Sequence, residues 1–192
     1  MSMPVQPPFT TMRPIRDGRR ITVTVGPGEA DYVGTDERAI QAALDCAGRL
    51  GGGTVVLRPG TFVLHNALRP HAGTCLRGAG EATVLRKAPG CTIPLVREAD
   101  WFEYAVQVEA AAAFRPGSGL ALTSGKAEWP RTKLFTVTAV DGNVLYLDRR
   151  TEKNFWPCEN AVAQNVHSLI HGWETHDVAV EDLALDGRSG EH

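Results

Sequence analysis

Short runs of β-branched and aliphatic residues, each ended by glycine or proline, make up the hydrophobic pattern of the first half of the chain. Residues 21–25, ITVTV, alternate as an extended strand does, which predicts a first β-strand. Four more such runs follow: TVVL (54–57), TFVL (61–64), TCLRG (74–78) and TVLRK (83–87). The intervening RPG, RPHAG and GAGE are turn-forming sequences. Strands this short and this close predict a solenoid whose coils stack about 4.8 Å apart, and not a sheet that alternates with helices.

One segment with helical periodicity precedes these runs. Its apolar residues recur at helical spacing: Ile40, Ala43, Leu44, Ala47 and Leu50. They predict an amphipathic helix over residues 36–50, capped by Thr35 and ended by Gly51. Because a solenoid exposes apolar core at its open end, we expect this helix to cover the first coil. The glycine triplet 51–53 is then expected to turn the chain sharply from the cap into that coil.

The middle of the chain has longer alternating segments. Phe135–Val140 and Val144–Leu147 flank the turn sequence DGN, which predicts an antiparallel hairpin. We interpret the stretch as an inserted antiparallel β subdomain; the alternative for AAAA (110–113) is the start of a helix. The coil pattern then returns in HSLIHG (167–172) and HDVAVEDLALDG (176–187), with Asp182 at a bend between two half-strands.

These patterns divide the chain into four parts. Residues 1–20, with four prolines, predict an extended arm. The cap helix and first coils occupy 21–97, the insert 98–165, and a further coil 166–192. Material for about three coils remains, near the minimum of ~3 repeats that a solenoid needs. Since no second cap follows the last strand, we expect a C-terminal continuation of the solenoid, or another chain, to cover the last coil.

The order of these motifs resembles a known family. GTDERAIQAALDCAGRLGGGTVVLRPGTFVL (34–64) combines an Asp-containing loop, an AIQAAL helix, a GGGTV turn and PGTF after the first coil strand. Together with CLRGAGEATVLRK, VAVEDLALDG and the insert sequence AAAFRPGSGLALTS, it resembles the N-terminal portion of the pectate-lyase superfamily. The resemblance spans roughly residues 20–187. It implies an all-β fold, a right-handed single-stranded parallel β-helix with an N-terminal capping α-helix and an inserted antiparallel β subdomain.

The resemblance also implies a function and a location. Members commonly act on or bind acidic or complex polysaccharides, which implies a polysaccharide lyase or glycoside hydrolase that is secreted or on the cell surface. Lyase branches use calcium, so calcium is the one cofactor that the resemblance raises. The galacturonan-hydrolase motifs Asn-Thr-Asp, Asp-Asp, Gly-His-Gly and Arg-Ile-Lys do not occur in the sequence, and whether the chain is an enzyme stays open. The alternative is a non-catalytic binding or assembly module of the tailspike or adhesin type.

Composition excludes other classes. The 192 residues are 43% hydrophobic and 22% charged, as in folded proteins, and a net charge of −2 with scattered Lys and Arg predicts no nucleic-acid partner. No apolar run approaches the ~20 residues that span a bilayer, and no secretory signal is recognised, so no membrane association is expected. The four cysteines form no CxxC pair: Cys46, Cys75, Cys91 and Cys158. Buried thiols are expected, with one or two disulfides as the alternative.

The residues that could take part in catalysis or metal binding cluster near the end of the sequence. Glu181 faces outward by alternation and Asp186 follows its strand, so these two are the candidate catalytic carboxylates, with structural roles as the alternative. Asp182 is expected to bond backbone amides at the bend. Carboxylates are the ligands that calcium prefers, yet no metal-binding set is identified. His167 and His171 would lie about 13 Å apart on one strand, too far to share a metal.

Aromatic residues supply the candidate substrate-binding positions. Trp129, Trp156 and Trp173 are proposed for this role, because exposed aromatic rings stack on sugars. Others cluster in or near the insert: Trp101, Phe102, Tyr104 and Phe155. The alternative is that these rings pack the insert onto the solenoid.

Overall fold

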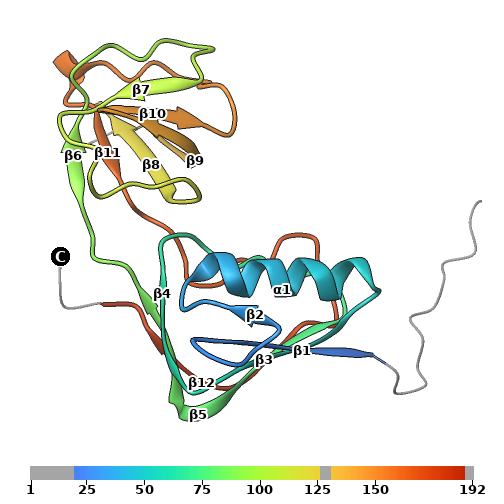
Figure 1. Cartoon of the computed structure of the whole chain (residues 1–192). Coiled ribbons are helices and arrows are strands. Elements are labelled where there is room, and N and C mark those ends of the chain that lie inside the picture. Colours follow the sequence, from blue (N-terminus) through green and yellow to red (C-terminus); the bar gives the residue numbers. More distant parts are fainter. Residues whose placement is uncertain (1–19, 126–130, 189–192) are drawn as a thin grey trace, which may run out of the picture.

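The computed structural model describes residues 20–125 and 131–188, which form one α-helix, a short 3₁₀ helix and two curled sheets (Figure 1). The elements are β1 (Ile21–Gly26), β2 (Tyr32–Val33), α1 (Glu37–Arg49), β3 (Gly53–Leu57), β4 (Gly60–Leu64), β5 (Thr74–Lys87), β6 (Thr92–Pro94), β7 (Ala105–Gln107), β8 (Gly119–Ser124), β9 (Arg131–Asp141), β10 (Val144–Leu147), η1 (Pro157–Glu159), β11 (Val162–Gln164) and β12 (Ala179–Asp186). The fold is mostly β, as predicted. Within the described residues, α1 is too short and too polar to cross a membrane.

The first sheet is a parallel stack in the order β12-β5-β3-β1-β2, with β4 also paired to β5. Apolar side chains lie in register across it: Val23 opposite Val55, Val55 opposite Leu76, and Leu76 opposite Val180. A parallel bridge between Leu68 and Ile170 continues the stacking beyond β4. The strands stack as predicted coils would, although they do not by themselves make a complete β-helix.

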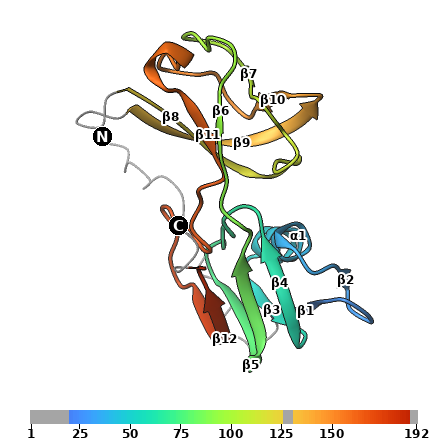
Figure 2. The same cartoon turned by 90° about the vertical axis from the view of Figure 1, so that its left-hand side faces the viewer.

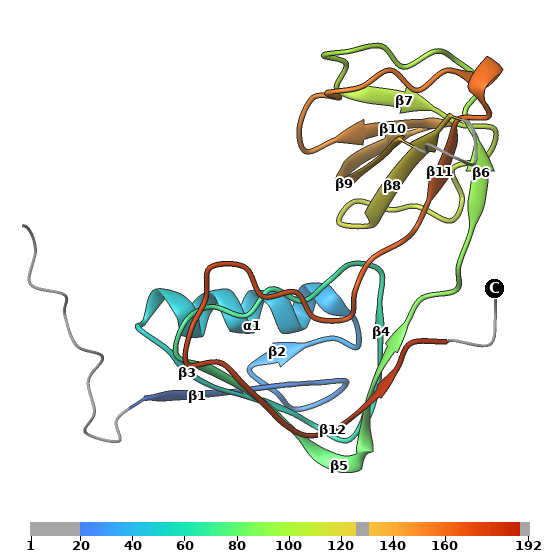
Figure 3. The ribbon, with the colours of Figure 1, turned by 180° about the vertical axis from the view of Figure 1, so that it is seen from behind.

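The longest strand of the stack is bent. β5 pairs with β3 over its first part and with β4 over its last part, while β12 follows β5 on both sides of the bend (Figure 3). The sequence predicts two strands, 74–78 and 83–87, separated by a turn at GAGE, and this division is wrong. Pairing with β12 persists through the bend, at Leu183 opposite Gly80, so the chain keeps one continuous strand. The predicted bend at Asp182 is confirmed, since its φ is +52° and the register shifts there.

The helix lies at the β1 end of the stack. Figure 2 shows α1 on the side of β1 and β2, with β12 on the opposite side. Its apolar stripe joins the core of the stack through Ile40, Ala43, Leu44 and Ala47. The cap residue is Asp36, whose carboxylate accepts a hydrogen bond from the Arg38 backbone N–H at 3.1 Å. The prediction of Thr35 is therefore wrong, and the Thr35 carbonyl instead accepts from the Val63 N–H in the coil.

The glycines that follow the helix are required by their backbone conformation and by close packing. Gly51 and Gly52 have φ values of +85° and +107°, which side-chain-bearing residues rarely adopt. A Cβ on Gly52 would lie 2.4 Å from the carbonyl oxygen of Gly73 in the next coil. The sharp turn from cap into coil is thus confirmed, and it also lets two coils approach.

The second sheet is antiparallel, in the order β6-β11-β8-β9-β10-β7, and encloses its own apolar core. The predicted hairpin is confirmed as β9 and β10, which pair antiparallel across Gly142–Asn143. The helical alternative for residues 110–113 is wrong: they form no helix, and Ala111 is buried in the core of this sheet.

The antiparallel strands β6 to β11 lie along the chain between β5 and β12, which are neighbours in the parallel stack. Two connections join the sheets, and buried Asn165 links them: its Oδ1 accepts from the Cys91 N–H at 2.7 Å, and its amide donates to the Pro89 carbonyl. The four-part domain division stays a prediction.

All four cysteines are free thiols, so the disulfide alternative is wrong. Three of them are only partly buried and Cys158 is exposed. The expectation of buried thiols is therefore wrong for Cys158 and holds only in part for the other three, of which Cys91 packs against the core of the antiparallel sheet.

Candidate functional site

The two candidate carboxylates pair with arginines of the neighbouring strand. Glu181 Oε2 lies 2.8 Å from Arg77 Nη2, and Asp186 Oδ2 lies 2.7 Å from Arg86 Nε. The backbone N–H of Arg188 and the Arg86 side chain lower the pKa of Asp186 below its ordinary value. Both pairs are half-exposed and join β12 to β5. Their assignment as catalytic residues stays a prediction.

The histidines and acids of the C-terminal segment do not assemble into one cluster. His176 lies 3.1 Å from Asp177 in an exposed pair, whereas His167 and His171 line a pocket between the sheets. Within residues 20–125 and 131–188, no group of three or more His, Cys, Asp or Glu side chains could hold a metal ion. Since Glu181 and Asp186 already pair with arginines, the described residues do not fit the calcium site that the resemblance raises.

The three predicted tryptophans have different surroundings. Trp173 is 74% exposed in the loop before β12. Trp156 is half-buried and its Nε1–H donates to Asp100 Oδ1 at 2.7 Å. Trp129 lies outside the described residues.

A stronger aromatic feature lies next to Trp156, in the turn before β7. We define the aromatic platform as Trp101, Phe102, Arg150 and Lys153. The rings of Trp101 and Phe102 have centroids 5.8 Å apart and are both exposed. The Arg150 guanidinium lies 4.7 Å from the Phe102 centroid, and Lys153 Nζ lies 5.8 Å from that of Trp101. The platform therefore combines exposed ring surface with two cations.

The turn that carries the platform is held by a buried threonine. Thr151 Oγ1 donates to the Asp100 carbonyl at 2.5 Å and accepts from the Glu103 N–H at 3.0 Å. Its carbonyl accepts from the Phe102 N–H at 2.9 Å. These bonds keep Phe102 at a φ of +76°, a conformation that costs about 1–3 kcal/mol and is concentrated at functional sites. The turn thus presents the Phe102 ring to solvent at a conformational cost.

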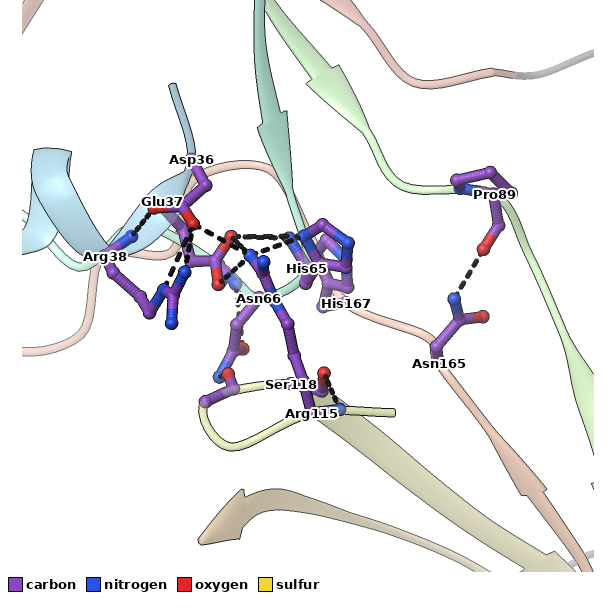
Figure 4. Close-up of polar contacts among 12 residues, drawn as sticks. Asp36, Glu37, Arg38, His65, Asn66, Pro89, Arg115, Ser118, Asn165 and His167 are labelled. Carbon is purple, nitrogen blue, oxygen red and sulfur yellow. Dashed lines mark hydrogen bonds and ion pairs between the residues drawn. The ribbon is translucent and has the colours of Figure 1, made fainter. Parts of the chain in front are cut away.

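A buried polar network joins the helix N-terminus to the turn before β8 (Figure 4). Glu37 is almost fully buried and accepts from the His65 N–H at 2.9 Å and from Arg115 Nη2 at 3.0 Å. Arg115 Nη2 also lies 3.1 Å from Asp36 Oδ2. Burial raises the pKa of Asp36, but the hydrogen bonds and charges of Arg38 and Arg115 outweigh it and lower the pKa below its ordinary value. This network connects the parallel stack to the antiparallel sheet.

The sequence pattern does not point to Arg150 and Lys153 as site residues, or to the Glu37–Arg115 network. Arg150 and Lys153 are visible in the sequence as cations, but the rings that they contact, Phe102 and Trp101, lie far away in the chain. Glu37 and Arg115 are likewise 78 residues apart.

No family model and no curated protein matches the sequence. Among solved structures the chain is similar to the Gp54 tailspike of Acinetobacter baumannii bacteriophage AP22, in complex with A. baumannii capsular saccharide, with 13% identity and a TM-score of 0.38 over 77% of this chain and 31% of that one. It is also similar to the tailspike gp61 of Pseudomonas phage phi297 (14%, TM-score 0.38, 76% and 31%). A third similar structure is the tailspike gp49 of Pseudomonas phage LKA1 (14%, 0.35, 68% and 25%). The chain spans less than a third of each tailspike. These matches do not confirm membership of the pectate-lyase superfamily.

Proposed function

We propose that this chain is the N-terminal portion of a right-handed parallel β-helix that binds an acidic or complex polysaccharide. The in-register parallel strands and the helix at the β1 end support the scaffold. The aromatic platform carries the functional part of the proposal. Its rings offer apolar faces to sugar rings, and its cations offer charge to carboxylates.

The construction of the platform separates it from an ordinary exposed apolar group. Each cation lies over one ring, which places a positive charge beside the exposed ring surface. A bound acidic sugar would contact ring and cation together. Because Thr151 already holds the turn in shape, binding would order few additional groups.

The open edge of the stack supports a further coil. In the ladder of Val23, Val55, Leu76 and Val180, the exposed fractions are 7%, 0%, 2% and 40%. The parallel ladder through Leu85 also ends at an exposed residue, Leu185. An edge strand with exposed apolar residues is a template for another strand. We therefore propose that a further parallel coil pairs with β12.

Cleavage by elimination or hydrolysis would need catalytic groups in addition to the platform. Glu181 and Asp186 are the candidates, and each would have to leave its arginine to act on substrate. The geometry of the described residues supports binding more directly than cleavage. We therefore favour the non-catalytic alternative, a binding module of the tailspike or adhesin type.

The proposed function is tested by affinity electrophoresis in gels that contain polygalacturonate, alginate or neutral dextran. Trp101→Ala is expected to lower the affinity for the acidic polymers about three- to tenfold, the range that one aromatic contact provides. Tyr146→Ala, which removes an exposed aromatic ring outside the platform and outside the predicted substrate-binding tryptophans, is the matched control. Equal losses in both variants, or no loss in Trp101→Ala, would contradict the proposal.

A second variant separates binding from folding. Phe102→Gly relieves the left-handed backbone conformation and is expected to leave the thermal stability equal or higher. It also removes a ring of the platform, so the affinity for acidic polymer should fall. A variant that is less stable and binds normally would show that the turn serves the fold alone.

A further inference from the structure

A pocket of about 210 Å³ lies between the two sheets. One wall is formed by residues 66–69 after β4 and 166–171 after β11, and the other by residues of β8 and β9 together with Arg149. Pockets for drug-sized molecules measure about 300–1,000 Å³. This pocket is therefore suited to a smaller molecule, and none of the aromatic platform residues lines it.

The walls of the pocket are joined by hydrogen bonds. The Gly119 N–H donates to the His65 carbonyl at 2.8 Å, and Asn66 Nδ2 donates to the Gly117 carbonyl at 3.0 Å. A Cβ on Gly119 would lie 2.9 Å from Asn66 Oδ1 and 3.1 Å from the Cβ of His167. The glycine thus permits the close approach of the two walls.

His167 supplies a hydrogen-bond acceptor at this pocket. Its Nδ1 lies 3.0 Å from the Ser168 carbonyl, which only accepts, so Nδ1 carries the hydrogen and Nε2 of the neutral ring is the acceptor. Burial lowers the pKa of His167, which keeps the ring neutral near pH 7. Among the described residues, Nε2 is buried without a hydrogen-bond partner. A ligand hydroxyl would satisfy it, and an unsatisfied buried acceptor is costly.

The charges around the pocket are positive. Arg69 and Arg149 line it, and the lining within the described residues includes no Asp or Glu. Arg149 is already engaged, since Nη1 lies 3.1 Å from Asp148 Oδ2 and its guanidinium lies 5.3 Å from the Phe135 centroid. Within residues 20–125 and 131–188, the Arg69 guanidinium has no hydrogen bond or ion pair. Arg69 is therefore the cation that a carboxylate would pair with.

We propose that this pocket binds one acidic sugar unit, with a ring hydroxyl donating to His167 Nε2 and the carboxylate pairing with Arg69. The proposal rests on the proposed polysaccharide binding and names the chemistry of one of its sugar units. It uses residues separate from the aromatic platform, so the two sites are tested separately.

The test is titration of the folded chain with sodium glucuronate, glucose and sodium acetate, followed by the imidazole NMR signals of His167 and by calorimetry. Glucuronate should bind saturably and about tenfold more tightly than glucose or acetate, since only it offers both groups. Arg69→Gln should weaken glucuronate about tenfold and leave glucose unchanged, whereas His167→Phe should weaken both. Arg97→Gln, which removes an exposed arginine outside the pocket, should change neither.

Absence of saturable glucuronate binding, or wild-type affinity in Arg69→Gln, would overturn the proposal. Because Arg69 is exposed, its variant stays informative even if His167→Phe fails to fold, which a thermal unfolding curve shows. If polymer binding depends on Trp101 while glucuronate fails to bind, the pocket proposal fails and the proposed function stands. Saturable, Arg69-dependent glucuronate binding with no polymer binding would support the pocket proposal and contradict the proposed function.

Discussion

The parallel stack and the antiparallel sheet differ in how they complete their cores. The antiparallel sheet buries aromatic or aliphatic side chains on β7 to β11, and Phe155 in the same core is fully buried. The parallel stack is closed by α1 at the β1 end but ends at β12 with Val180 and Leu185 exposed. The stack thus ends in an exposed apolar edge, whereas the antiparallel sheet is a closed body that carries the aromatic platform on its surface.

The largest expected effect compares two leucines at the same position of successive coils. Leu85 and Leu185 lie opposite each other, but the first is fully buried and the second is 56% exposed. Leu85→Ala should lower the free energy of unfolding by about 2–5 kcal/mol, because it leaves a cavity. Leu185→Ala should cost less than about 1 kcal/mol. Urea unfolding measures both, and equal losses would mean that β12 is already covered in solution.

The elements of the parallel stack show how far the sequence predicts the fold. Alternation at 21–25 and 54–64 and the apolar stripe of the helix report directly on which face is buried, so the strands and the helix are predictable. The bend in β5 is not, because GAGE is compatible with a turn and only pairing with distant β12 keeps it a strand. Local sequence likewise could not choose between Thr35 and Asp36 as the cap, because the Thr35 carbonyl accepts from the distant Val63 N–H in the coil.

The candidate sites were less predictable than the fold. Aromatic residues near the insert were visible, but the choice among them depends on exposure and on cations supplied from about fifty residues away, as Arg150 is for Phe102. The pocket joins Arg69 to His167, which only the stacking of Leu68 on Ile170 brings together. Long-range pairing, and not local pattern, creates both sites.

The next prediction concerns the connection between the two regions. Glu37 is buried on the helix side and Arg115 is about one-third exposed on the other. Glu37→Gln should lower the free energy of unfolding by about 1–3 kcal/mol, below the range for fully buried pairs because water reaches Arg115. Glu37→Gln combined with Arg115→Gln should cost less than the sum of the single variants. Additive losses in this double-mutant cycle would show that the two regions are not coupled through this pair.

A smaller effect is expected at the open edge of the stack. The exposed apolar edge of β12 should make the chain self-associate at high concentration, and Val180→Lys should weaken that association about tenfold by charging the edge. Val33→Lys places the same charge on β2 at the opposite end of the stack and should leave the association unchanged. Sedimentation equilibrium measures both, and a wild-type chain that stays monomeric would contradict the open edge.

The smallest expected effect is a pH dependence at the junction of the two regions. Burial lowers the pKa of His167, and the charged or titratable groups that act on it are Lys87, Glu37 and His65. Because the unfolded chain keeps a pKa near 6.5, it binds more protons than the folded chain below that value. The contribution of His167 to stability is therefore complete above about pH 6.5 and is lost as the pH falls toward the lowered folded pKa. The stability difference between wild type and His167→Gln, measured by urea unfolding, should thus shrink from about pH 7.5 to about pH 5. A difference that grows on acidification would mean that the folded chain stabilises the charged form of His167, and the neutral acceptor assigned to the pocket would then be wrong.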